Sequence, residues 1–350
     1  MNRTKRLAAA LSACLALSAW PRASAQGAGG GDQRVTLYVV VTDKSGNPVA
    51  GLQHQDFTVL DNKRQQPISS FRAIDESGKT EDSPVRVIFV MDEVNVSFRA
   101  MSNARQQLER YLRQAGGQLP LPMSLVIFNE KSTQVQGTPT RNGNVLADSV
   151  HAIIAGAPRE LEGGLLENQV WRIRISLRAV GNLIGYERTQ PGRKLLIWLS
   201  PGWPLIEESI DNLTSKAKQT NFQTLVKLST ALRQAQITLY SIDPLGTDDA
   251  GSLGNVYYQN FLHGVPSADR FQSGDLTIPV LAIQSGGQVL NRSNDVASLI
   301  SNCVADAMSY YSLTFDSSPV VHPDEYHDLR VKIDKPGVVA RTRTGYYAQP

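Results

Sequence analysis

The sequence predicts an α/β protein in which a doubly wound, mostly parallel β-sheet is inserted in a small antiparallel β-domain formed by both chain ends. In the middle of the chain, short and wholly apolar runs alternate with segments whose apolar residues recur every three or four positions. These are the patterns of parallel strands buried on both faces and of amphipathic crossover helices. Turn-rich β segments stand before and after this central block. The length of 350 residues suits about two domains.

The composition is that of an ordinary globular chain, with 41% hydrophobic and 19% charged residues, so disorder and fibrous folds are excluded. Two cysteines are too few for a disulfide-rich scaffold or a cysteine zinc cluster. The net charge is +3, but four basic residues and no acid stand in the first 25 positions, which leaves −1 for the remainder. Because nucleic-acid-binding domains concentrate basic residues, we expect no nucleic acid partner.

Residues 1–25 predict a secretory signal peptide. Basic residues precede a 14-residue apolar stretch from Leu7 to Trp20, and small residues at 23–25 provide a cleavage site before Gln26. The apolar stretch is shorter than the roughly 20 residues that span a bilayer. We therefore expect an exported protein with no transmembrane segment, located in the periplasm, on the cell surface or outside the cell.

A second interpretation of the N-terminus is a lipid anchor. The segment Leu11-Ser12-Ala13-Cys14 matches the pattern at which lipoproteins are cleaved and lipidated on the cysteine. The apolar run before Cys14 is short and continues beyond it, which favours the signal peptide.

The N-terminal part of the β-domain is expected over 33–75, after a flexible lead at 26–32. β-Branched and aromatic residues predict its strands, and Gly46, Asn47 and Pro48 supply turn chemistry between two of them. The expected strands are 35–42, 57–60 and 68–74. Residues 75–83 are polar and form a predicted linker.

The central α/β block is expected over 84–308. Buried strands are predicted at 85–91, 123–128, 195–199 and 237–242, helices at 98–112, 166–184 and 296–308, and a helix-rich stretch at 206–234. The helix over 98–112 is predicted from one apolar stripe that begins with Phe98 and Met101. The long connection 244–275 carries aromatic residues that either form an interface or pack onto their own domain.

The β pattern returns over 309–348, the C-terminal part of the β-domain. Strands are predicted at 311–315, 329–333 and 338–344. His322 and His327 bracket Asp324 and Glu325, which we interpret as a polar turn and not as a metal cluster. Throughout the chain we find no glycine-rich phosphate loop and no Gly-x-Ser-x-Gly elbow, so we expect no enzyme activity.

Several segments in order resemble a known family. The alternating strands and helices from Asp92 to Ser312 look like a von Willebrand factor type A domain. The flanking segments resemble the opening and closing of the bacterial von Willebrand factor A-related family first described from acidobacteria. These segments are 41–49, 51–52, 56–59, 285–287, 310–313, 331–333, 335–337 and 345–348.

The resemblance implies a Rossmann-like domain that binds protein partners, commonly through a Mg²⁺-type metal site at the carboxyl edge of the sheet. Of the family's Asp-x-Ser-x-Ser motif only Asp92 is present, because Val94 and Val96 replace the two serines. Ser97 and either Thr138 or Thr140 would complete the ligands, and we take Asp92, Ser97 and Thr140 as the candidate metal set. Pro201 stands where the later acidic ligand would be. The site is therefore degenerate, with no firm cofactor and at most weak Mg²⁺ or Mn²⁺ binding, and the alternative is that Asp92 caps the following helix.

We interpret the chain as an exported, non-enzymatic protein-binding module for adhesion or scaffolding. Its partner-binding edge is predicted to comprise Asp92, Asn95, Ser97, Ser200 and Trp203. An alternative is a structural envelope component that contacts partners through edge strands of its β-domain. A hydrolase that uses Asp92 with Ser97 is a third hypothesis, for which no base and nucleophile pair is recognisable.

Overall fold

The structure is a computed structural model that describes residues 34–74, 84–153, 165–203, 213–246, 258–317 and 322–349. The predicted signal peptide, the lead at 26–32, Cys14 and the predicted linker 75–83 lie outside these ranges. Across the described ranges, no helix combines the length and the apolar character that crossing a membrane requires.

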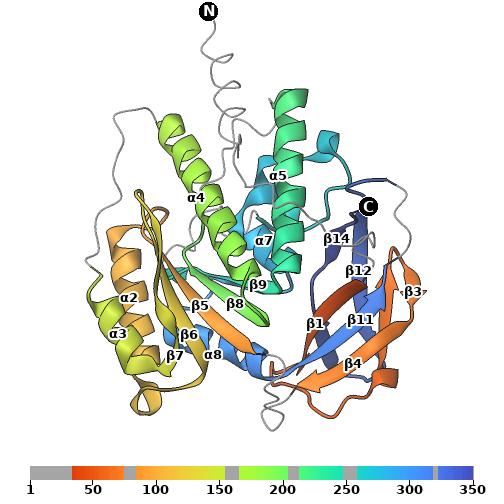
Figure 1. The fold of residues 1–350 in the computed structure, drawn as a ribbon, viewed down its shortest axis with the longest axis horizontal. Coiled ribbons are helices and arrows are strands. Elements are labelled where there is room, and N and C mark those ends of the chain that lie inside the picture. The colour runs from red at the N-terminus through yellow and green to blue at the C-terminus, as the bar shows by residue number, and fades with distance from the viewer. Residues whose placement is uncertain are drawn as a thin grey trace, which may run out of the picture.

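A six-stranded, mostly parallel sheet forms the centre of one half of the molecule (Figure 1). Read from β7, the strand order is β7-β6-β5-β8-β9-β10, and only β7 runs antiparallel to its neighbour. Numbered along the chain this is 3-2-1-4-5-6, the order in which a doubly wound sheet reverses direction beside its first strand. The strands are β5 (Val85–Asp92), β6 (Gln118–Phe128), β7 (Thr133–Asn142), β8 (Arg193–Leu199), β9 (Ile237–Ile242) and β10 (Val289–Leu290).

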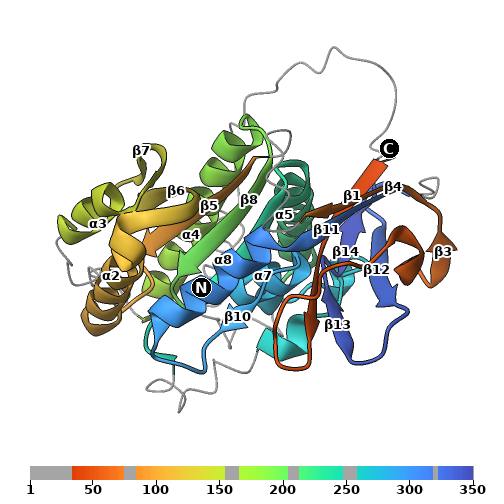
Figure 2. The same ribbon diagram turned by 90° about the horizontal axis from the view of Figure 1, so that it is seen from below.

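Helices cover both faces of this sheet (Figures 1 and 2). One face carries α2 (Phe98–Leu112), α3 (Gly143–His151) and α8 (Val296–Met308), and the other carries α4 (Leu165–Arg188), α5 (Ser215–Gln234) and α7 (Ile278–Gln284). Successive side chains of a strand point to opposite faces. Phe89 accordingly packs in the cluster of α2 and α8, whereas Ile88 and Val90 pack in the cluster of α4 and α5.

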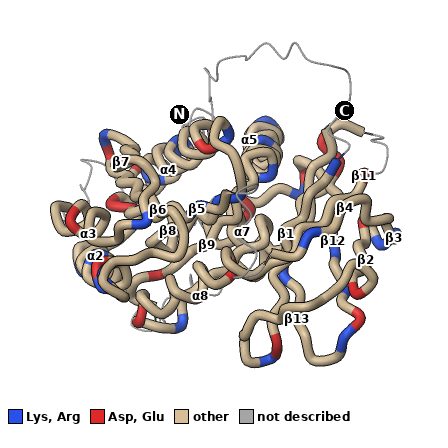
Figure 3. Tube along the Cα trace, turned by 60° about the horizontal axis from the view of Figure 1, so that its bottom comes forward, with Lys and Arg blue, Asp and Glu red and all other residues tan. Residues whose placement is uncertain are grey.

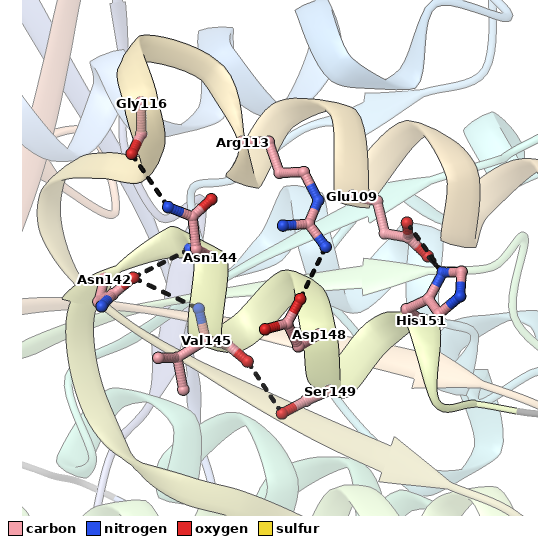
Figure 4. A network of polar contacts seen from close by, with 9 residues as sticks. All are labelled: Glu109, Arg113, Gly116, Asn142, Asn144, Val145, Asp148, Ser149 and His151. Atoms are coloured by element: carbon pink, nitrogen blue, oxygen red, sulfur yellow. Dashed lines mark hydrogen bonds and ion pairs between the residues drawn. The ribbon is translucent and has the colours of Figure 1, made fainter.

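The contact between α2 and α3 shows which forces hold the helices in place. Arg113 forms an ion pair with Asp148 at 2.8 Å, and His151 lies 3.3 Å from Glu109 (Figure 4). In both pairs at least one of the two side chains is solvent-exposed. An exposed ion pair contributes only about 0 to 1 kcal/mol to the free energy of unfolding. The buried apolar residues of the two helices, which belong to one core cluster with the sheet, therefore supply most of the stabilisation.

Two four-stranded antiparallel sheets form a β-sandwich in the other half of the molecule (Figure 1). Their orders are β13-β1-β11-β4 and β14-β12-β2-β3, and residues of both sheets share one core cluster. Strands from the two ends of the chain pair directly, β1 with β11 and β2 with β12. The strands are β1 (Arg34–Asp43), β2 (Phe57–Asp61), β3 (Arg64–Gln66), β4 (Ile68–Ile74), β11 (Tyr310–Asp316), β12 (Tyr326–Ile333), β13 (Val338–Arg341) and β14 (Gly345–Tyr347).

The structure departs from the sequence prediction in several elements. Only 338–341 of the predicted strand 338–344 is a strand, β13, and β14 begins after it, at Gly345, in the other sheet. β3, β7, β10, α3 and α7 were not predicted. Phe98 was expected in the buried stripe of α2, but it is 57% exposed at the first position of the helix, and the buried stripe begins at Ala100 and Met101. In the described part of the long connection, Phe261 and Phe271 are buried, so these two aromatic residues pack onto their own domain.

Candidate functional site at the carboxyl edge of the sheet

The carboxyl ends of the parallel strands meet at one edge of the six-stranded sheet, where doubly wound folds place their ligands. β5 ends at Asp92 and turns into α2 through residues 93–97. Asp92 Oδ1 accepts hydrogen bonds from the backbone N–H groups of Val94 and Asn95, both at 3.0 Å. The side-chain amide of Asn95 donates to both carboxylate oxygens, at 3.1 and 2.9 Å. The carboxylate thus organises the turn that follows its own strand.

Two further side chains fix this turn from neighbouring elements. The indole Nε1 of Trp198, on β8, donates to Asp92 Oδ2 at 2.8 Å. The amide of Asn95 also donates to the hydroxyl of Ser176, on α4, at 2.9 Å. Asp92 is fully buried. Burial raises the pKa of Asp92, while hydrogen bonds from Asn95, Trp198 and Ser200 oppose the rise.

The loop after β8 is also internal to the fold. Ser200 is fully buried, and its hydroxyl accepts from the backbone N–H of Gly202 at 2.8 Å. Gly202 has φ of 91°, and a Cβ at this position would lie 3.1 Å from the Cβ of Ile278, so only glycine suits the turn. Trp203 is 4% exposed and packs in the core cluster of α4 and α5.

These facts correct the predicted partner-binding edge. Asp92, Ser200 and Trp203 are buried and have no surface to offer a partner. Asn95 is half-buried, and only Ser97 is exposed. Phe98, which was assigned to the core, is the exposed aromatic residue at this edge.

The alternative in which Asp92 caps α2 is also wrong. The N-cap of α2 is Ser97, whose hydroxyl accepts from the backbone N–H of Ala100 at 3.2 Å. Asp92 instead holds the preceding turn, an arrangement typical of aspartate side chains that bond to N–H groups two or three residues on.

The residues present do not fit the metal site that the resemblance implies. A divalent cation needs free oxygen lone pairs, but N–H donors face both oxygens of Asp92. Val94 and Val96 are buried apolar residues at the serine positions. Across the described ranges there is no group of three or more His, Cys, Asp or Glu residues that could hold a metal ion.

Thr140 is remote from Asp92. The register places Thr140 opposite Met123, whereas Asp92 lies level with Phe128. Five residues of β6 separate the two levels, about 16 Å along the strand. Because β7 is antiparallel, its end nearest Asp92 is Thr133, so Thr140 does not join Asp92 and Ser97 in one ligand set.

The structure adds residues to this edge that the sequence analysis did not name. Trp198 and Ser176 are buried partners that reach Asp92 and Asn95 from other elements. Glu93 is half-buried beside Asn129. Burial raises the pKa of Glu93, and a hydrogen bond from Asn129 opposes the rise. No sequence spacing connects these positions, since they meet only when the strands are side by side.

Comparison with known proteins gives distant structural likenesses. No family model matches the sequence, and no curated protein matches it. The chain is similar to the human COPII-coat protein Sec24c, with 10% identity and a TM-score of 0.37 over 80% of this chain and 46% of that one. It is similar to the pilus adhesin SpaC from Lactobacillus rhamnosus GG, with 10% identity and a TM-score of 0.36 over 89% of this chain and 49% of that one.

A third likeness is to the VWA domain of SpRpn10, with 12% identity and a TM-score of 0.23 over 46% of this chain and 74% of that one. This chain spans about half the length of the COPII-coat protein and of the adhesin. TM-scores of 0.23 to 0.37 do not establish a shared fold. The function is therefore inferred from the residues of this chain alone.

Proposed function

We propose that this chain is an exported, non-enzymatic protein-binding module that presents the loop between β5 and α2 to a protein partner. The observation that carries the proposal is Phe98, which is 57% exposed beside the exposed Ser97 at the carboxyl edge of the sheet. Exposed aromatic side chains are common anchors of protein interfaces. The buried hydrogen bonds from Asn95 and Trp198 to Asp92 hold the adjoining turn rigid. A rigid turn loses less conformational entropy when a partner binds.

The charge distribution supports a protein partner over nucleic acid. Lys and Arg residues are interspersed with Asp and Glu along the described trace (Figure 3). A nucleic-acid-binding domain would gather its basic residues on one face or along one helix.

Enzyme activity is not part of the proposal because the candidate groups are engaged elsewhere. Asp92 receives its hydrogen bonds from amide, indole and hydroxyl groups. Ser97 caps α2 with its hydroxyl. A hydrolase that pairs the two would need a base within reach of the serine, and the described hydrogen bonds of Ser97 and Asp92 include no histidine or lysine.

The role of Phe98 is testable with a matched control on the opposite edge. Tyr186 is 50% exposed near the C-terminal end of α4, at the amino edge of the sheet. We expect Phe98→Ala to weaken capture of a partner from envelope extracts of the source cells by about tenfold or more, as interface anchors do. Tyr186→Ala should leave capture unchanged. Quantitative pull-down of the same protein band with each variant provides the measurement.

The alternative partner surface is an edge strand of the β-sandwich. Val339, on the edge strand β13, is 57% exposed. If Val339→Arg abolishes capture and Phe98→Ala does not, the chain acts through its β-sandwich, as a structural envelope component would. Equal capture by all variants would contradict both surfaces.

Export and domain organisation complete the proposal. We propose that residues 1–25 are removed and that 84–308 is an α/β unit inserted between 33–75 and 309–348, which the pairing of β1 with β11 supports. N-terminal sequencing of the protein recovered from the source cells should give Gln26. A mature chain that begins at a lipidated Cys14 would contradict cleavage before Gln26 and would support the lipid-anchor interpretation.

A further inference from the structure

The strand β4 forms one margin of the β-sandwich. It is the last strand in the order β13-β1-β11-β4, and across the described ranges it pairs with β11 alone. Ser69, Ser70, Arg72 and Ala73 of this strand are exposed. A strand at the edge of a sheet presents a row of backbone N–H and C=O groups with which a further strand can pair.

The other edge strands carry features that limit such pairing. β13, β3, β14 and β10 have only two to four residues each. β7 is longer, but Gly137 has a φ of 67° and Pro139 lacks an N–H group, and both residues interrupt a regular strand edge. β4 has seven residues, without proline, glycine or an acidic residue, and Arg72 is its only charge. It is therefore the edge that is least protected against strand addition.

The pairing with β11 determines which backbone groups of β4 point outward. Ser70 lies opposite Thr314 in the register of the two strands. The carbonyl oxygen of Thr314 accepts a hydrogen bond from the hydroxyl of Ser69 at 3.1 Å, so this carbonyl is directed toward β4. Directions alternate along an antiparallel ladder. Ser70 therefore bonds to β11, and the next residue, Phe71, directs its N–H and C=O groups away from β11.

The sequence of β4 is complementary to itself in the antiparallel direction. When two copies of residues 68–74 pair about Phe71, each Phe71 lies opposite the same residue of the second copy, and Ser70 lies opposite Arg72. The single charge of the strand thus faces a serine, whereas like charges directly opposite each other would be destabilising. The centre of the pairing falls on Phe71, whose backbone groups point outward, so the two copies can exchange hydrogen bonds at that point.

We propose that two copies of this chain associate through their β4 strands, which pair antiparallel about Phe71 and join the two β-sandwiches through one continuous sheet. Each copy contributes the same strand, so the contact has two-fold symmetry and association stops at the dimer. Phe71 packs on Phe57 and Tyr311, and the pairing brings these aromatic clusters of the two copies together. Because a contact through one strand is small, the dissociation constant should be about 10 to 100 µM.

The test is sedimentation velocity of the mature chain, residues 26–350, from about 1 to 300 µM, a range that brackets this dissociation constant. We expect monomer at the lowest concentration and dimer at the highest. Ser70→Lys sets a lysine opposite Arg72 of the second copy, twice in each dimer, so the dissociation constant should rise about tenfold. Ser70→Glu sets opposite charges there and should lower it about tenfold. Ser70 is exposed, so both variants should fold as the wild type does.

Two controls make the test specific. Val339→Lys adds the same charge to β13, the opposite edge of the same sheet, where Val339 is 57% exposed, and should dimerise as the wild type does. Phe98→Ala should also leave the dimer unchanged, because the contact is separate from the loop between β5 and α2. The proposal is overturned if the wild type stays monomeric over the whole range, if species larger than a dimer form, or if Ser70→Lys and Ser70→Glu dimerise equally.

Discussion

Replacing Asp92 with alanine is expected to lower the free energy of unfolding by about 3 kcal/mol or more. The substitution leaves the indole N–H of Trp198 and two backbone N–H groups without their acceptor, while the amide of Asn95 keeps only Ser176. Each buried donor left unsatisfied costs about 1 to 3 kcal/mol, and water that enters the gap recovers part of it. Urea unfolding of wild type and variant, followed by Trp fluorescence, measures the difference.

Asp92→Asn distinguishes this structural role from a metal site. The amide keeps one acceptor but turns an N–H₂ group toward donors, so we expect it to destabilise the protein by about 2 kcal/mol. A carboxylate held ready for a cation behaves in the opposite way, because its removal relieves uncompensated charge in the metal-free protein. Ser97→Ala is the matched control and should cost about 1 kcal/mol, the usual value of an N-cap. Stabilisation by Mg²⁺ in the wild type that disappears in Asp92→Asn would contradict this interpretation.

The second large effect is expected in the core of the β-sandwich, where Asp61, His327 and Tyr346 form a buried polar network. His327 Nδ1 lies 2.8 Å from Asp61 Oδ1, and the Tyr346 hydroxyl donates to Asp61 Oδ2 at 3.0 Å. All three side chains are buried. Asp61→Ala removes the carboxylate that both groups contact and leaves only the 3.1 Å contact between the Tyr346 hydroxyl and His327 Nδ1, so we expect a loss of about 3 to 5 kcal/mol, as when one partner of a buried ion pair is removed.

This network also predicts a pH dependence. The hydrogen bond to Asp61 raises the pKa of His327 above 6.5, against the lowering effect of burial. A histidine whose pKa is raised by folding contributes stability that is complete below its unfolded pKa and is lost as pH rises through its folded pKa. The stability difference between wild type and His327→Gln should therefore shrink as the pH rises from about 6 to 9.

Tyr346→Phe provides the control, because it removes the hydroxyl that donates to Asp61 and no group that titrates in this pH range, since burial raises the pKa of Tyr346. Its cost should be about 1 kcal/mol and should not change over the same pH range. A His327→Gln difference that is equally flat would show that the imidazole is not charged in the folded protein.

The sequence predicted the fold best where apolar residues are periodic. The helices at 98–112 and 296–308 have the predicted bounds, because each buries one continuous stripe. β7 was not predicted because it is a polar edge strand with no buried residue. It therefore lacks the alternation of apolar and polar residues that marks a half-buried strand. α7 has only seven residues, nearly all apolar, and such a run does not distinguish a helix from a strand.

The candidate site was predicted in position but not in composition. Asp92 lies at the carboxyl edge of the sheet, because the last residue of every parallel strand lies at that edge. Trp198 could not be assigned to it, because pairing of β5 with β8 brings the two together across 106 positions. Thr140 was misplaced because the direction of an unpredicted strand was unknown. The role of His327 was missed because its partner Asp61 lies 266 positions away, and the segment alone indicates a turn.

The pairing of β1 with β11 determines when this protein can finish folding. The hydroxyls of Thr36 and Thr314, 278 positions apart, lie within hydrogen-bond distance across these strands, so the contact order of the sandwich is high and its formation is slow. At about 5 to 20 residues per second, synthesis of the 278 positions from Thr36 to Thr314 takes roughly 14 to 56 seconds, and β1 lacks its partner β11 during this time. During that time the uncharged segment Val35–Val41 has an open strand edge and the composition that favours intermolecular β-pairing. The chain is therefore most vulnerable to aggregation before the sandwich closes, when its folded stability has no effect yet.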